Sequence, residues 1–129
     1  MNQNYNFKSL QYSEDNKEQE TNPDDIKVFE TGQTKTIDFV QKDGTRQSFS
    51  YGHFMTAWMG IKDDERFIKI FFATHLITIK GYCLDPIYDH FINQYLKILR
   101  VSDERYLDQV KEHEPFIVEI NIVWKKEDK

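Results

Sequence analysis

The side chains best suited to chemistry are one cysteine and four histidines, and their spacing decides what they could do. The densest group lies in the apolar stretch 67-FIKIFFATHLITIKGYCL-84, with His75 in its middle and Tyr82 and Cys83 at its exit. A catalytic cysteine needs a nearby base that holds it as the thiolate. A hairpin with His75 at its tip would separate His75 from Cys83 by about 20 Å. We therefore expect Cys83 to be a small buried residue before a helix rather than a nucleophile.

His53 offers one other route to a reactive site. If the strand that contains His53 ends beside the start of the helix, then His53, Tyr82, Cys83 and Tyr88 would line a pocket between helix and sheet. Such a pocket would suit a small-molecule ligand or a hydrolase-like reaction. The structural evidence for this pocket would be a cavity in which the side chains of His53 and Cys83 lie within hydrogen-bond distance of each other. The sequence leaves this alternative open.

Metal and cofactor binding are disfavoured by the same kind of spacing argument. The histidines stand at positions 53, 75, 90 and 113, without the HxxxH, CxxC or HExxH spacing that gathers ligands around one ion. The five glycines are spread singly and form no phosphate-binding loop. We therefore predict no metal ion, no cofactor and no catalytic residue.

Composition and charge bound the class of protein. The chain has 129 residues, enough for one compact domain, and its single cysteine excludes an intramolecular disulfide. No apolar run is long enough to span a bilayer and no export signal is visible, so we expect no membrane contact and a cytoplasmic protein. Residues 31–129 carry fifteen acidic and fourteen basic side chains, the latter scattered singly. This near-neutral balance argues against nucleic-acid binding.

Residues 1–30 differ from the rest of the chain, with seven acidic and three basic side chains. Their polar composition cannot bury enough apolar surface to offset the entropy of ordering, and we predict a disordered acidic tail. Tyr5, Phe7, Leu10 and Tyr12 interrupt this tail with apolar side chains two to three residues apart. These four are either sticky residues in a solvated tail or a short segment that docks on a partner or on the domain itself.

The two-residue period that begins at Thr34 indicates a β-hairpin. A three-residue loop over 42–44, with Gly44 in the left-handed conformation, pairs Ile37 with Phe49 and keeps the apolar side chains on one face. A strand over 52–60 and an exposed loop over 61–66 follow.

The apolar stretch quoted above predicts a second hairpin, because its alternation changes parity. Isoleucine and phenylalanine occupy the even positions 68, 70 and 72 but the odd positions 77 and 79. A four-residue turn over 73–76, which pairs Phe72 with Ile77 and Ile70 with Ile79, puts all of them on one face. The same register sets Lys69 opposite Lys80.

The strongest helix signal begins at Asp85, a good N-cap, followed by Pro86 at the first helical position. Apolar residues then recur with helical spacing to about Leu99 and cover roughly half of the helix circumference. This arc is wider than packing on one sheet needs. We therefore expect its flank around Ile92 and Leu96 to be covered by the C-terminal segment or by a second subunit.

A short second helix from Ser102 and a strand over 116–124 complete the chain. We predict one α+β domain over residues 31–129: an antiparallel sheet of five to six strands built from hairpins, open or curled into a half-barrel, and packed by one main helix over about 85–99. The final strand, with Trp124 among its core residues, returns to the sheet. The leading functional hypothesis is a small cytosolic, non-catalytic binding or regulatory module that acts through protein contact as a homodimer.

Overall fold

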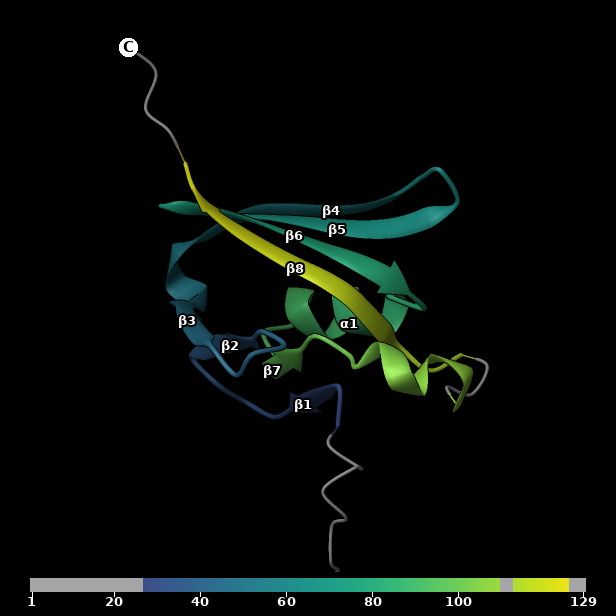
Figure 1. The fold of residues 1–129 in the computed structure, drawn as a ribbon. Coiled ribbons are helices and arrows are strands. Elements are labelled where there is room, and N and C mark those ends of the chain that lie inside the picture. The colour runs from purple at the N-terminus through teal and green to yellow at the C-terminus, as the bar shows by residue number, and fades with distance from the viewer. Residues whose placement is uncertain (1–26, 110–112, 126–129) are drawn as a thin grey trace, which may run out of the picture.

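The computed structural model describes residues 27–109 and 113–125, and within them eight strands form two four-stranded sheets. Sheet 1 has the strand order β1-β7-β2-β3 and sheet 2 the order β4-β5-β6-β8 (Figure 1). The elements are β1 (Phe29–Thr31), β2 (Thr36–Val40), β3 (Arg46–Ser50), β4 (Phe54–Lys62), β5 (Glu65–Phe72), β6 (His75–Tyr82), α1 (Asp85–Ile92), β7 (Leu96–Arg100) and β8 (Phe116–Trp124). The α+β class is as predicted, but the single sheet of five to six strands is wrong.

The β2–β3 hairpin confirms the predicted register, with Ile37 opposite Phe49. The backbone N–H of Gln41 donates to the carbonyl of Thr45 at 2.8 Å and closes the loop. Within this loop Gly44 has a φ of +92°, which a residue without a Cβ adopts at little cost. Turn chemistry and alternation therefore agree here, and the local sequence was enough to place the hairpin.

The β5–β6 hairpin has the predicted inner face but a different register. Ile70 faces Ile77, rather than Ile79, and the turn contains only Ala73 and Thr74. Lys69 consequently faces Thr78 and not Lys80. A shift of two residues leaves parity unchanged, so the apolar alternation was satisfied by both registers. The shorter turn gains additional strand pairing, which the four-residue turn would have lost.

β4 lies two residues later than predicted, from Phe54 to Lys62 instead of over 52–60. The expected loop over 61–66 shrinks to Asp63 and Asp64, whose φ angles are 55° and 66°. Two successive positive φ angles are the requirement of a two-residue hairpin turn whose twist matches the strands. Aspartate tolerates this conformation better than most side chains, which explains why no glycine is needed.

The helix is half as long as predicted, because α1 ends at Ile92 and Gln94 takes a φ of +57°. The chain then enters β7 at Leu96 and pairs with β1 on one side and with β2, in parallel, on the other. Without β7 the strands β1 and β2 would have no common neighbour. The helical spacing beyond Ile92 was thus overridden by tertiary hydrogen bonding. Asp85 is the first helical residue, and its predicted role as N-cap falls to Leu84.

The C-terminal part follows the prediction in outline. A 3-10 helix at Glu104–Gln109 replaces the second helix expected after Ser102, and β8 pairs with β6. A register shift between Lys80 and Gly81 turns Ile117 inward, so that this residue is fully buried. Trp124, predicted to be in the core, is 71% exposed at the end of β8.

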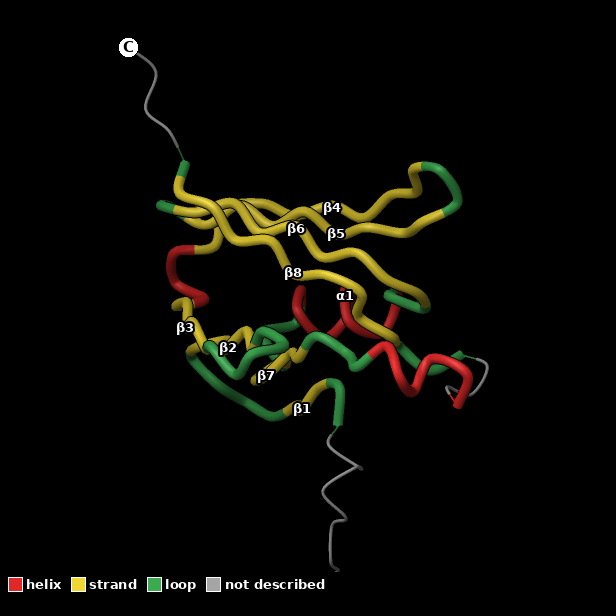
Figure 2. The backbone as a smooth tube through the Cα atoms, in the orientation of Figure 1, coloured by secondary structure: helices red, strands yellow, loops and turns green. Residues whose placement is uncertain are grey.

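The core lies between the inner faces of the two sheets, and α1 contributes to it from between the layers (Figures 1 and 2). The rings of Phe49 from sheet 1 and Phe72 from sheet 2 stack at 4.7 Å. The ring of Phe91 from α1 lies 5.3 Å from Tyr51 and 5.0 Å from Phe54. One continuous apolar cluster therefore joins both sheets and the helix.

The predicted tail ends in ordered structure. Val28 and Phe29 pack against the core, and Phe29 begins β1. The predicted disorder of residues 1–26 lies outside the described residues.

Candidate binding surface

The residues of the predicted pocket are not brought together. His53 ends a 3-10 turn after β3, and its carbonyl accepts a hydrogen bond from the N–H of Ala73 at 2.8 Å. Cys83 follows the far end of β6, where Gly81 pairs with Arg66. The length of β5 therefore separates His53 from Cys83, which is about 20 Å at the strand rise.

The other members of this set have structural surroundings. Cys83 is half-buried and has a φ of +54°, which turns the chain from β6 into α1. The ring of Tyr82 lies 6.3 Å from that of Phe116, and the hydroxyl of Tyr88 donates to the carbonyl of Ala57 at 3.2 Å. Each of these contacts fixes the corner where sheet 2 continues into α1.

His75 does not lie at a loop tip. It is the first residue of β6 and is buried, with its ring centroid 5.0 Å from that of Phe49 and 4.2 Å from that of Trp124. Its Nδ1 is 2.7 Å from the hydroxyl oxygen of Thr74. The imidazole therefore packs between aromatic rings and is not presented to a substrate.

The predicted interface flank is not one surface. Leu96 is fully buried in β7, whereas Ile92 lies half-exposed at the end of α1. The carbonyl of Leu96 accepts a 2.7 Å hydrogen bond from the hydroxyl of Tyr51. The two apolar residues were assigned to one helix face, and the early end of α1 separates them.

A different apolar surface occupies the outer face of sheet 2, over which no described helix or strand lies (Figure 1). Because Ile70, Ile77 and the other core residues point inward, strand alternation turns their neighbours outward. We call five of the exposed or half-buried apolar side chains here the apolar stripe. It consists of Met55, Trp58, Phe71, Leu76 and Val123.

The apolar stripe runs across all four strands of sheet 2. Phe71 faces Leu76, and Leu76 faces Val123. The rings of Trp58 and Phe71 lie 5.5 Å apart. Met55, Trp58 and Val123 are 64%, 44% and 42% exposed. The sequence signal for this surface was the segment 67-FIKIFF-72, in which apolar residues occupy both parities and so both faces of one strand.

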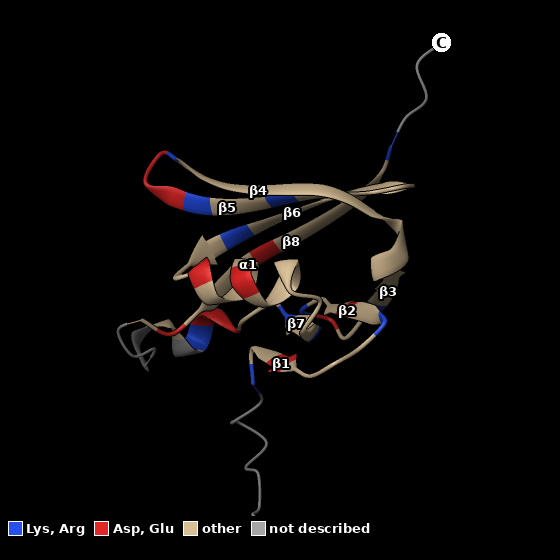
Figure 3. Ribbon diagram, turned by 180° about the vertical axis from the view of Figure 1, so that it is seen from behind, with Lys and Arg blue, Asp and Glu red and all other residues tan. Residues whose placement is uncertain are grey.

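Charged residues also lie on the strands of sheet 2, and Figure 3 marks their positions along the chain. The pairing registers place three lysines and two glutamates on the outer face of sheet 2: Lys62, Lys69, Lys80, Glu65 and Glu119. Lys125, directly after β8, is a fourth lysine on this face through its contact with Phe71. Lys80 and Glu119 approach to 4.0 Å, and the ammonium of Lys125 lies 5.9 Å from the ring centre of Phe71. The net charge of +2 on this face contrasts with −5 for the whole chain.

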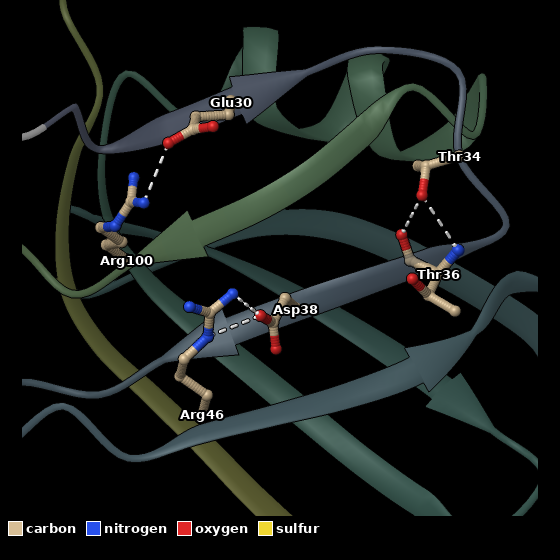
Figure 4. A network of polar contacts seen from close by, with 6 residues as sticks. All are labelled: Glu30, Thr34, Thr36, Asp38, Arg46 and Arg100. Atoms are coloured by element: carbon tan, nitrogen blue, oxygen red, sulfur yellow. Dashed lines mark hydrogen bonds and ion pairs between the residues drawn. The ribbon is translucent and has the colours of Figure 1, made fainter.

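On the outer face of sheet 1, charged and polar groups pair with one another beside the half-buried Val40 and Ile98 (Figure 4). Arg46 forms an ion pair with Asp38, with Nε donating to the carboxylate at 2.7 Å. Arg100 donates to the Glu30 carboxylate at 2.9 Å. The hydroxyl of Thr34 donates to the carbonyl of a residue two positions on. These groups already have protein partners.

A groove of about 250 Å³ lies between the β2–β3 hairpin and the free edge of β8. The side-chain amide of Gln41 crosses it and donates to the carbonyl of Ile120 at 2.9 Å. The lining is amide, hydroxyl and apolar: Phe39, Gln41, Thr45, Gln47, Ile120, Asn121 and Ile122. These groups can bind a neutral ligand by hydrogen bonds and packing, but they supply no acid, base or nucleophile.

Among residues 27–109 and 113–125, no cluster of three or more histidine, cysteine or carboxylate side chains is arranged to hold a metal ion. The described helices are all too short or too polar to cross a membrane. Searches with protein-family models, among curated proteins and among solved structures each returned no match to this chain.

Proposed function

We propose that the protein is a small, non-catalytic binding module that contacts a protein partner through the outer face of sheet 2. The observation that carries this proposal is the apolar stripe, which spans four strands without cover from any described element. Contiguous exposed apolar surface with a polar border is characteristic of interaction sites. Tryptophan and methionine, both present here, are enriched at the centre of protein interfaces.

The size of the face favours a transient partner. Four strands at about 4.8 Å spacing and eight residues at about 3.3 Å rise present roughly 500 Å² in projection. This is below the ~800 Å² that each partner buries in a standard stable complex. A second copy of the chain is disfavoured as the partner, because two such faces would bring like charges of +2 together.

The two tryptophans provide a matched test. Trp58 lies in the apolar stripe, whereas Trp124 is even more exposed but lies outside it. Full-length wild type, Trp58→Ser and Trp124→Ser are used as baits in lysate from the source cells, and captured proteins are quantified by mass spectrometry. Circular dichroism and thermal unfolding establish that both variants fold.

We expect a specific partner whose capture falls at least about tenfold with Trp58→Ser, since interface tryptophans contribute 2 kcal/mol or more. Trp124→Ser should retain that partner. A partner retained by both variants, or lost equally from both, contradicts the proposed surface.

A further inference from the structure

We infer that the apolar stripe is also the docking surface for the chain's own N-terminal segment, residues 5–20. This inference rests on the proposed function, because it assigns the same face of sheet 2 a contact role. Residues 1–26 lie outside the described part, and only their sequence bears on the inference. Docking would make the chain its own competitor for the partner.

The apolar residues of the segment suit the stripe in kind and in length. Tyr5, Phe7, Leu10 and Tyr12 are the apolar interruption in an otherwise polar region. An extended chain from Tyr5 to Tyr12 covers roughly 23 Å, and four neighbouring strands with their side chains cover about 19 Å. Their aromatic rings can therefore reach the whole width of the stripe, including Trp58 and Phe71.

The charges are complementary as well. Residues 5–20 carry four acidic and two basic side chains, a net charge of −2, and the outer face of sheet 2 carries +2. An acidic segment with apolar residues at one end matches a face with an apolar stripe beside lysines. Nucleic acid is less well matched, because tight binding needs many phosphate contacts and two glutamates stand among the four lysines.

The chain is long enough for the contact to form within one molecule. Lys27 precedes β1, which belongs to sheet 1, so the segment must pass from one layer to the other. Fourteen residues, 13–26, extend to roughly 46 Å at most, which exceeds the ~10 Å between packed sheets and leaves length for the path around the edge of sheet 2 to its outer face. A tethered segment also acts at an effective concentration near the millimolar range, which favours even a weak contact.

The test uses nuclear magnetic resonance on the full chain, because Trp58 and Trp124 each give a separate indole N–H signal. The segment variant replaces Tyr5, Phe7, Leu10 and Tyr12 by serine. A matched control replaces four polar residues of the same region, Asn2, Gln3, Asn4 and Asn6, by serine. All eight positions precede the described domain, and unchanged signals from the core residues verify that the fold is intact.

We expect the segment variant to shift the Trp58 signal and the backbone amides around Phe71 and Val123, and to leave Trp124 unchanged. High salt should shift wild type in the same direction, and dilution should have no effect, as for a contact within one chain. The control variant should resemble wild type. Identical Trp58 signals in wild type and segment variant would overturn the inference, as would a shift that disappears on dilution.

Partner binding separates this inference from the proposed function. If both hold, the segment variant binds the partner on the order of threefold to tenfold more tightly, because the competing docked state is removed. Loss of binding in Trp58→Ser without any effect of the segment variant overturns only the inference. If a mixed-sequence oligonucleotide at low salt shifts Trp58 and the segment does not, the surface belongs to nucleic acid and the inference is overturned.

Discussion

The outer faces of the two sheets differ although both sheets share one core and have four strands each. On sheet 1, Asp38 is paired with Arg46 and Glu30 with Arg100. On sheet 2, Met55 and Trp58 are exposed without cover. The comparison indicates which face gains from a partner, because covering apolar surface yields about 25 cal/mol per Å². Covering paired charges requires desolvation and yields little.

The largest expected effect tests whether sheet 2 is held together as one surface. A Cβ added to Gly81 would lie 2.1 Å from the carbonyl oxygen of Phe116, a backbone atom of β8 that has no rotamer to escape. We predict that Gly81→Ala lowers the free energy of unfolding by about 3 kcal/mol, the upper part of the range for overpacking. Chemical denaturation followed by circular dichroism measures this change.

Gly44→Ala is the internal control for this substitution. Its added Cβ would have open space around it, so only the positive φ opposes it, and the loss should be about 1 kcal/mol. If Gly81→Ala and Gly44→Ala are equally stable, the backbone of β8 moves to accept the added methyl group, and the contact between β6 and β8 does not hold sheet 2 rigidly.

The second effect concerns Tyr51, which joins the connection between β3 and β4 to β7 and packs against α1. This buried residue follows β3 and donates from its hydroxyl to the carbonyl of Leu96 in β7 at 2.7 Å. Tyr51→Phe leaves that carbonyl without its partner, and we predict a loss of about 1–2 kcal/mol near neutral pH. Urea denaturation provides the measurement, and a change below the experimental error would contradict the importance of this bond.

The same variant has a predictable pH dependence. Burial raises the pKa of the Tyr51 hydroxyl in the folded state. Its stabilising contribution is therefore complete below the unfolded-state pKa of about 10 and is lost as pH rises toward the folded-state value. Above about pH 10, wild type should lose up to about 1.4 kcal/mol per pH unit more than Tyr51→Phe. Parallel pH profiles of the two proteins would exclude this linkage.

The parts of the fold that follow from local sequence were predictable. The β2–β3 hairpin follows from its alternation and Gly44, and the inner face of β5 and β6 follows from parity. The register of the β5–β6 hairpin could not be predicted, because a slip of two residues keeps the same apolar side chains on the inner face. The end of α1 was missed because the decisive partners of β7, namely β1 and β2, are distant in sequence.

The candidate surface was hidden for a related reason. Phe71 lies in the apolar stretch over 67–84 and Trp58 in the predicted strand over 52–60, and the sequence alone does not say which face of a sheet is covered. The predicted pocket failed to assemble because His53 and Cys83 depend on opposite ends of one hairpin. Apolar residues at both parities of β5 were the available signal, since a strand with one solvated face needs only one.

The third effect concerns the ion pair between Asp38 and Arg46 on the outer face of sheet 1. Asp38 and Arg46 face each other diagonally on β2 and β3, and the Asp38 side chain is only 18% exposed. A double-mutant cycle with Asp38→Ala and Arg46→Ala should give a coupling free energy of about 0.5–1 kcal/mol. High salt should reduce it. A coupling near zero would mean that the polar face of sheet 1 is not satisfied by its own pairs.

The smallest effect on stability is expected for substitutions in the apolar stripe on the outer face of sheet 2. Met55→Gln and Val123→Thr change exposed side chains of the apolar stripe, and each should alter the free energy of unfolding by no more than about 0.5 kcal/mol. Binding of a hydrophobic dye to the native protein should nevertheless fall in both. Val40→Thr, on the outer face of sheet 1, should leave dye binding unchanged. If the stripe variants were strongly destabilised instead, the stripe would be part of the core. If Val40→Thr abolished dye binding, the accessible apolar surface would lie on sheet 1.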